Sequence, residues 1–348
     1  ATLVIRPHFF SQNSVTLDAK WMKINSVELI SAEGNKKLPF TYDTLHLKID
    51  LQKFYTSSQQ VTLVIDYVAL PYTQNAAQIE LGRGLYFIDA DDKNPYKPTH
   101  LWTQGEEESA SCWFPTMDAT NQKSSEEVFV TIDKNLTSLS NGLLLDSKDN
   151  NDGTKTDHWK QDKPHSSYLF FLCVGDFYKW KTNWRDKEVS AYTFPEYQDA
   201  LGDMFKNMPE MMEYFSQLLG VDFPWDKMAN VMVFDYTAGA MENTSAIVYF
   251  EKMLINKPQM IDNNFDWIIA HELYHQWFGD LVTAESWANL TLNESMADYS
   301  ECLWYSYKYG KDQGDAYHNK AMENYLHTSK YKNEPIVNYY YDKVHDIF

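Results

Sequence analysis

The chain has 348 residues, of which 44% are hydrophobic and 16% aromatic, so a disordered chain is excluded and more than one packed core is expected. Its 30 Lys and Arg residues against 49 Asp and Glu residues give a formal net charge of −19, which repels nucleic-acid phosphates and anionic lipids. We therefore expect no nucleic-acid partner. We expect no membrane segment either, because no stretch approaches the roughly 18 apolar residues that a spanning helix needs.

Residues 1–193 alternate between short apolar runs and clusters of turn residues. Clear runs occupy residues 61–68, 128–132 and 168–174, and residues 148–153 are composed like the tip of a hairpin. Regularly spaced strands without a helical period predict an antiparallel, sandwich-like, all-β N-terminal domain.

The pattern changes after residue 193, and we place a second domain at residues 194–348. Apolar residues between 201 and 219 recur at steps of three and four and stop at Gly220, which predicts one amphipathic helix. Two strands are expected at residues 230–234 and 245–250, and the chain from Glu294 onward is expected to be mostly helical. This mixture predicts an α+β domain.

An apolar stretch in this second domain contains His271-Glu-Leu-Tyr-His275. The stretch has no Gly or Pro before Gly279, which predicts a buried helix, with Asp262 or Asn263 as its N-cap. Residues four apart lie on one face of a helix, so the two imidazoles can reach one point.

Glu294 follows with 18 residues between it and His275, and it can supply a third ligand from the next helix. Two His and one carboxylate with an open fourth position are a recurring set for a catalytic zinc ion. Glu272 points about 100° away from His271 around the helix, so it is expected to face a metal-bound water as the general base. A structural metal or a chance match of the short motif are the alternatives, and both are disfavoured by the spacing of Glu294.

A second motif, Gly239-Ala-Met-Glu-Asn243, precedes the first. The two motifs together resemble those of the M1 zinc aminopeptidases, and residues 103–106 and 114–118 are similar to that family's N-terminal half. The resemblance implies a β-saddle domain followed by a thermolysin-like zinc-peptidase domain that is truncated at its C-terminus, with one Zn²⁺ as cofactor. It also implies that a tyrosine which stabilises the oxyanion lies beyond Phe348, so that the fragment has weak activity or none.

The same resemblance assigns a substrate and the residues that bind it. The substrate is a peptide with a free N-terminus, whose α-amine is bound by Glu242 and Glu106. Gln104 lines the pocket of the first side chain, and Gly239 and Ala240 contact the substrate backbone. Without the family likeness, Glu106 is part of an acidic run and is typical of a solvated surface.

Two other functions share these motifs. One is a lipid-epoxide hydrolase of the leukotriene A4 hydrolase type, and the other is a non-catalytic scaffold with the same fold. Intact ligand positions and an intact Glu272 disfavour the scaffold.

Overall fold

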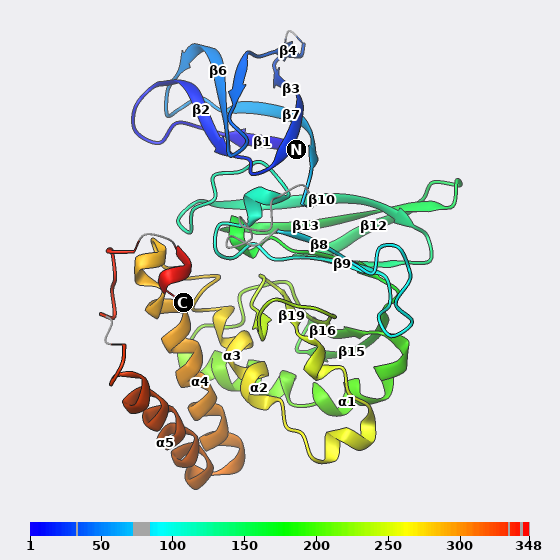
Figure 1. Cartoon of the computed structure of the whole chain (residues 1–348), viewed down its shortest axis with the longest axis vertical. Coiled ribbons are helices and arrows are strands. Elements are labelled where there is room, and N and C mark those ends of the chain that lie inside the picture. The colour runs from blue at the N-terminus through cyan, green and yellow to red at the C-terminus, as the bar shows by residue number, and fades with distance from the viewer. Residues whose placement is uncertain (33, 72–83, 333–334, 342–343, 348) are drawn as a thin grey trace.

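The computed structural model describes residues 1–32, 34–71, 84–332, 335–341 and 344–347. Figure 1 shows three layers: strands at the N-terminal end, long sheets in the middle, and a mixed sheet with helices at the other end. Within the described residues no helix is both long and apolar enough to cross a bilayer.

The first layer contains two antiparallel sheets, with strand orders β1-β7-β3-β4 and β2-β6-β5. Their apolar faces share a core of their own, in which Leu17, Leu47 and Leu63 are completely buried. The strands are β1 (Thr2–Ile5), β2 (Gln12–Asp18), β3 (Met22–Ile30), β4 (Lys36–Lys37), β5 (Phe40–Tyr42), β6 (His46–Tyr55) and β7 (Val61–Ala69).

The middle layer also contains two antiparallel sheets, with orders β10-β13-β12 and β11-β14-β9-β8. The predicted hairpin tip joins β12 to β13, where Asp149 pairs with Lys155. The strands are β8 (Leu85–Ile88), β9 (His100–Thr103), β10 (Lys123–Asp133), β11 (Thr137–Ser140), β12 (Leu143–Asp149), β13 (Thr154–Ser166) and β14 (Leu172–Gly175). The predicted all-β N-terminal part is confirmed.

The third layer is a mixed sheet of order β15-β16-β17-β19-β18, in which β16–β17 and β17–β19 are parallel. Its strands are β15 (Tyr178–Trp184), β16 (Lys187–Thr193), β17 (Lys227–Met232), β18 (Ala240–Met241) and β19 (Ala246–Tyr249). The helices around it are α1 (Leu201–Met204), α2 (Met208–Leu219), α3 (Asp266–His275), α4 (Thr291–Tyr309) and α5 (Lys311–Thr328). The predicted α+β fold of this part is confirmed.

The domain boundary predicted after residue 193 lies inside this sheet, because β16 pairs directly with β17. The sequence pattern changes from strand to helix at residue 194, but an α+β unit can begin with strands, so the change of pattern does not mark the start of the unit. We propose that the structural boundary precedes β15.

Two predicted helices begin or continue differently. The helix expected over residues 201–219 is divided into α1 and α2, because Pro209 lacks an N–H and is tolerated only in the first turn of a new helix. The expected N-cap at Asp262 or Asn263 is wrong, since α3 begins at Asp266 after a separate 3-10 turn.

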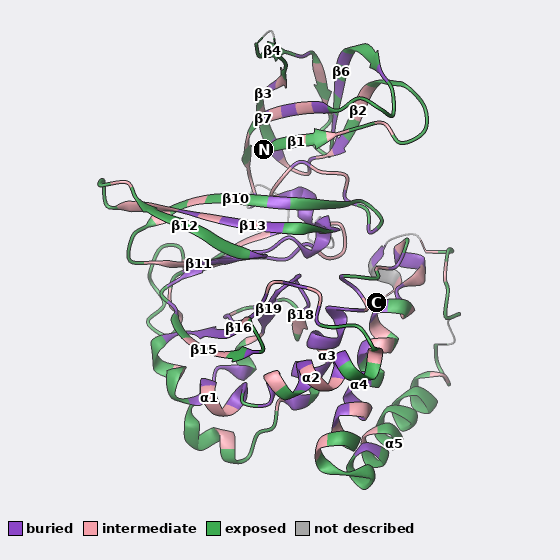
Figure 2. Cartoon of the chain, turned by 180° about the vertical axis from the view of Figure 1, so that it is seen from behind, coloured by how far each residue is buried: buried purple, intermediate pink, exposed green. Residues whose placement is uncertain are grey.

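The middle sheets and the mixed sheet share one hydrophobic core. In Figure 2, α3 is mostly buried whereas α5 is mostly exposed. The helix that carries the metal-binding motif is therefore a core element, held by packing on several sides.

Candidate metal centre and active site

A buried carboxylate fixes the beginning of α3. Asp266 is 4% exposed and accepts hydrogen bonds from Asn207 Nδ2 at 2.9 Å, Trp304 Nε1 at 2.9 Å and Tyr309 Oη at 2.7 Å. An acidic residue in the first turn is also favoured by the helix dipole. These bonds connect α3 to α2 and α4, so the two helices that carry the predicted metal ligands are held in one register.

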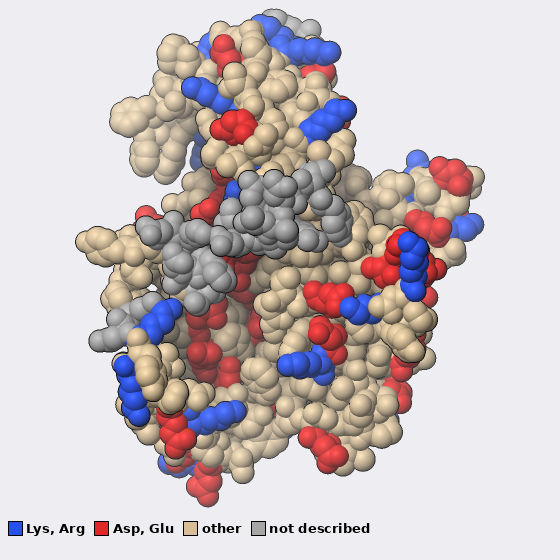
Figure 3. Space-filling view, in the orientation of Figure 1, with Lys and Arg blue, Asp and Glu red and all other residues tan. Residues whose placement is uncertain are grey.

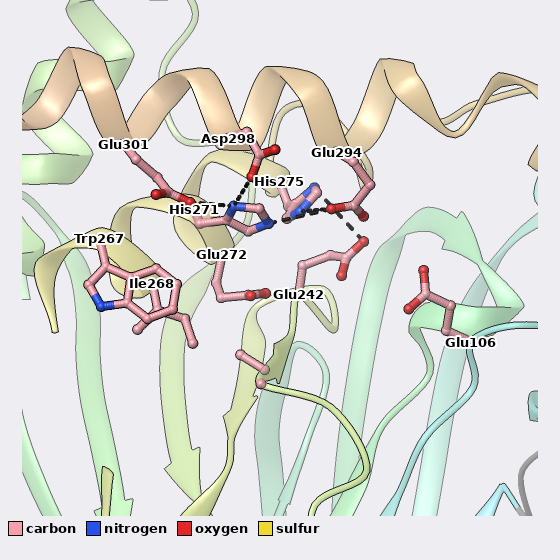
Figure 4. A pocket seen from close by; sticks show the side chains of 12 residues that line it. Glu106, Glu242, Trp267, Ile268, His271, Glu272, His275, Glu294, Asp298 and Glu301 are labelled. Atoms are coloured by element: carbon pink, nitrogen blue, oxygen red, sulfur yellow. Dashed lines mark hydrogen bonds and ion pairs between the residues drawn. The ribbon is translucent and has the colours of Figure 1, made fainter. Parts of the chain in front are cut away.

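His271, His275 and Glu294 come together in the structure. Glu294 Oε2 lies 3.5 Å from His271 Nε2 and 3.7 Å from His275 Nε2. Figure 4 shows all three side chains pointing to one place, the His residues from α3 and Glu294 from α4. Tetrahedral zinc with bonds of about 2.0–2.1 Å separates its ligand atoms by roughly 3.4 Å. The two separations are therefore close to those of a zinc site.

The second nitrogen of each ring has a partner that fixes its orientation. His275 Nδ1 donates to the Phe278 carbonyl at 3.0 Å, and His271 Nδ1 lies 2.9 Å from Glu301 Oε1 and 3.4 Å from Asp298 Oδ1. A carbonyl oxygen can only accept, so His275 carries its proton on Nδ1 and leaves the Nε2 lone pair free. Carboxylates and carbonyls in this position orient the imidazoles of metal sites.

Three groups of side chains in the described residues could hold a cation. The groups are His271, His275 and Glu294; His271, Asp298 and Glu301; and Glu106, Glu242 and Glu294. The first group offers two nitrogens and one oxygen, the donors that zinc prefers, and leaves room for a fourth ligand. The second would use the nitrogen of His271 that faces away from His275. The first group therefore fits zinc best.

Glu272 faces the same cavity but is not one of the three side chains that converge as candidate metal ligands (Figure 4). Its side chain is 6% exposed, and Oε2 has no hydrogen-bond partner among the described residues. Burial raises the pKa of Glu272 well above its usual value, and the negative charges of Glu242 and Glu294 add to the shift although His271 opposes it. The carboxylate is thus free to exchange a proton inside the cavity.

Glu106 and Glu242 lie beside the candidate metal ligands, and their carboxylates lie within 4.8 Å of each other and of Glu294. Burial and mutual repulsion raise the pKa of Glu106, and burial raises that of Glu242. Glu106 therefore does not lie on a solvated surface, as its acidic run alone would indicate. Because both carboxylates are hard to ionise without a partner, a cation between them is strongly favoured.

His271 and Glu294 differ from these carboxylates, because their charged forms are favoured. Burial lowers the pKa of His271, but its contacts with Asp298, Glu294 and Glu301 outweigh burial and raise it well above the usual value. Burial would raise the pKa of Glu294, but the adjacent histidines outweigh it and lower the pKa. A proton held by His271 therefore balances part of the negative charge of the surrounding carboxylates.

The cavity has a volume of about 280 Å³. Gly239 and Ala240 line the cavity, whereas Gln104 is buried outside the lining and accepts a hydrogen bond from the Glu106 N–H at 3.1 Å. Six carboxylates lie along the cavity, and no described lining residue is Lys or Arg. Figure 3 shows Asp and Glu side chains gathered along a hollow in the surface. The site therefore attracts cations.

Four lining residues were not predicted: Trp267, Ile268, Asp298 and Glu301. Their spacing in the sequence could have identified them as neighbours of the site. Asp298 and Glu301 follow Glu294 by four and seven residues, and Trp267 and Ile268 precede His271 by four and three, so each pair shares a helix face with a predicted ligand.

Comparison with known proteins agrees with this fold. The family model "Peptidase M1 N-terminal domain" matches residues 2–169, and "Peptidase family M1 domain" matches residues 204–347. Aminopeptidase 2 of Candida albicans is 33% identical over 314 residues, which cover 86% of this chain and 31% of the relative. Aminopeptidase N of Haemonchus contortus is 28% identical over 308 residues, which cover 83% of this chain and 30% of the relative. The chain thus spans about a third of the length of these relatives.

Among solved structures, an M1 zinc metallopeptidase from Deinococcus radiodurans superposes with a TM-score of 0.78. The match covers 99% of this chain and 74% of the other at 18% identity, so it supports the fold alone. The two family models cover nearly the whole chain, one for each part of the fold. The chain therefore belongs to peptidase family M1.

Proposed function

We propose that this chain carries the active site of a zinc-dependent aminopeptidase, which hydrolyses the N-terminal residue from peptides with a free α-amine. The observation that supports it best is that one cavity holds both a zinc-type ligand set with a free carboxylate and, within 4.8 Å of Glu294, a pair of further carboxylates. The two reported relatives are named aminopeptidases, and a mutant of the Deinococcus radiodurans enzyme is described as bound to a Tyr-Ser-Ala substrate.

In this proposal, His271, His275 and Glu294 hold the zinc ion. Bound there, zinc would lower the pKa of a water ligand and polarise a carbonyl group. Glu301 keeps His271 in the required orientation through the contact of 2.9 Å with Nδ1, and the Phe278 carbonyl does the same for His275.

Glu272 acts as the general base and acid. Its carboxylate takes a proton from the attacking water and gives it to the nitrogen of the leaving peptide. Burial suits this role because it raises the pKa of Glu272 well above its usual value, which makes the carboxylate a better proton acceptor.

Glu106 and Glu242 bind the protonated α-amine of the substrate. An ammonium between them would offset their repulsion and make charge-assisted hydrogen bonds. An enzyme that removes one residue must measure a fixed distance from the amine to the first peptide bond, and two carboxylates beside the metal provide that distance. Gly239 and Ala240 line the cavity along this path and are placed to contact the substrate backbone.

The test compares the full chain with Glu272→Gln, after both are loaded with zinc. We expect Glu272→Gln to keep one equivalent of zinc and lose roughly a thousandfold or more of its arylamide hydrolysis, because proton transfer is removed. The matched control is Glu285→Gln, which removes an exposed carboxylate, and its activity should match that of the wild type.

A second substrate separates the alternatives. An N-acetylated arylamide should be hydrolysed far more slowly than the free one, because it has no charge for Glu106 and Glu242 to bind. Equal rates would exclude the amine site. Hydrolysis of a lipid epoxide without arylamide hydrolysis would favour the epoxide hydrolase, and absence of bound zinc would favour a scaffold.

A further inference from the structure

We propose that Lys227 is a positioning residue, which fixes the turn that carries Glu242 and so pre-forms the amine site. The inference rests on the proposed function, because it assigns Glu242 the role of binding the substrate amine. Lys227 does not touch the cavity, and it acts through hydrogen bonds that connect two parts of the fold.

Lys227 is the first residue of β17, and its side chain is 5% exposed. The ammonium donates to the Ser140 carbonyl at 2.9 Å, the Ser245 carbonyl at 3.1 Å and Ser245 Oγ at 3.3 Å. All three acceptors are neutral oxygens, which match the three N–H groups of an ammonium. Lys227 therefore bonds to two chain segments at once.

The turn of residues 242–245 is almost completely buried, with Glu242 3% exposed and Ser245 0%. Ser245 has a φ of 62°, a left-handed conformation that a residue with a side chain adopts only when its surroundings hold it there. The bonds from Lys227 to the carbonyl and hydroxyl of Ser245 supply such a hold.

Hydrogen bonds lead from Ser245 to Glu242. The Ser245 N–H donates to Gln276 Oε1 at 2.8 Å, and Gln276 Nε2 donates to the Glu242 carbonyl at 2.8 Å. Gln276 follows His275 directly. The same side chain thus connects the Glu242 turn to the end of the helix with the metal-binding histidines.

The segment after β11, which belongs to the N-terminal part of the fold, also bonds to the turn of residues 242–245. Asn141 Nδ2 donates to the Thr244 carbonyl at 2.8 Å, and the Gly142 N–H donates to Ser245 Oγ at 2.9 Å. The ammonium of Lys227 bonds to Ser140 in this segment, so it connects the segment to the turn. The position of Glu242 therefore depends on both parts of the chain.

Burial of this lysine is unfavourable by itself, because desolvation lowers its pKa to about 7, with Lys179 adding to the shift. An apolar side chain would avoid that penalty but would leave two buried carbonyls with one donor fewer. Glu242 Oε1 has no hydrogen-bond partner among the described residues and lies 3.9 Å from His275 Nδ1, so the position of the carboxylate is set largely by the backbone of the turn. A small shift of the turn should therefore weaken amine binding.

The test measures binding of L-leucinamide by calorimetry to the zinc-loaded full chain with Glu272→Gln, so that the ligand is not hydrolysed. Lys227→Met is added to this background, and the matched control is Lys163→Met, whose ammonium contacts Pro224 and Asp226 at the surface. N-acetyl-L-leucinamide serves as the ligand without a charge. Turnover of a leucine arylamide is measured separately in the chain with Glu272 intact.

We expect Lys227→Met to weaken binding of L-leucinamide by roughly tenfold, with no change for the acetylated ligand or for zinc content. A purely structural lysine would lower thermal stability but leave the ratio between the two ligands as in Lys163→Met. A folded Lys227→Met variant with the parent affinity would overturn the inference.

If Lys227→Met does not fold, Ser245→Ala decides, because it removes only the hydroxyl that accepts from Lys227 and Gly142. A several-fold weaker affinity for L-leucinamide supports the inference, and an unchanged affinity overturns it. If the lysine affects L-leucinamide binding but the intact chain hydrolyses no arylamide, the proposed function fails while the inference stands. No binding by any variant would refute both.

Discussion

Gly279 lies against the metal-binding histidine, and Gly279→Ala should weaken zinc binding. Its φ of +140° is one that residues with a side chain rarely adopt. An added Cβ would lie 3.1 Å from the His275 carbonyl oxygen, 3.2 Å from His275 Nδ1 and 3.5 Å from Glu242 Oε1. Backbone strain at such a position is about 1–3 kcal/mol. The nearest atoms that can yield belong to the imidazole, which must move by a few tenths of an ångström.

If displacing His275 from the overpacked contact costs about 2 kcal/mol, zinc affinity falls by roughly thirtyfold. Competition with a chelator of known affinity measures that change. Gly153→Ala is the matched control, because Gly153 has a φ of +96° but its added Cβ would have no atom within 4 Å. Gly153→Ala should lose stability and keep its zinc affinity. The reasoning is refuted if Gly279→Ala is folded and binds zinc as tightly as Gly153→Ala.

Three other predictions concern the surroundings of the metal centre. Glu301→Gln should weaken zinc binding by about 10–100-fold, because it removes the charge that orients His271. Asp298→Asn, at an exposed position, should change zinc binding little, and equal effects of the two substitutions would contradict the prediction. Asp266→Ala should lower the free energy of unfolding by about 3–5 kcal/mol in urea titrations, since three donors, two of them on buried side chains, lose one acceptor, and a loss below about 1 kcal/mol would contradict it. In the zinc-free chain, the raised pKa values of Glu272 and His271 mean that the folded state holds more protons than the unfolded one at pH values above 4.5 and 6.5, respectively. Their contribution to stability is therefore lost as pH rises, and zinc should raise the unfolding midpoint more at about pH 8 than at about pH 5.5, with the opposite order contradicting the assignment.

The ligand set could be predicted from the sequence because helix geometry links spacing to direction. His271 and His275 are four residues apart on one apolar helix, so their convergence does not depend on the rest of the fold. The prediction of Glu294 as the third ligand required only that a second helix lie beside the first. The structure brings the three together as this pattern predicts.

The surrounding residues depend on tertiary structure. Glu301 contacts His271 because α4 packs against α3. Its spacing from Glu294 places it on the same helix face, but the sequence does not show that this face reaches His271. Lys227 is similar: lysines are rarely buried, so its place in the core follows only from the neighbouring oxygens in two distant segments.

Element boundaries were predicted less well, for local reasons. The apolar pattern continues across the break between α1 and α2, so it predicts one helix. The break itself comes from Pro209, which lies in the first turn of α2. The sheet pairing of β16 with β17 links strands that are separated by both helices, and sequence periodicity carries no information about that partner.

X-ray absorption at the zinc edge of the loaded full chain tests the central claim most directly. We expect a four-coordinate ion with two imidazole nitrogens, one carboxylate oxygen and one oxygen from solvent, and we expect His275→Ala to remove one imidazole. An ion enclosed by four protein atoms, or one whose coordination is unchanged by His275→Ala, would contradict the account.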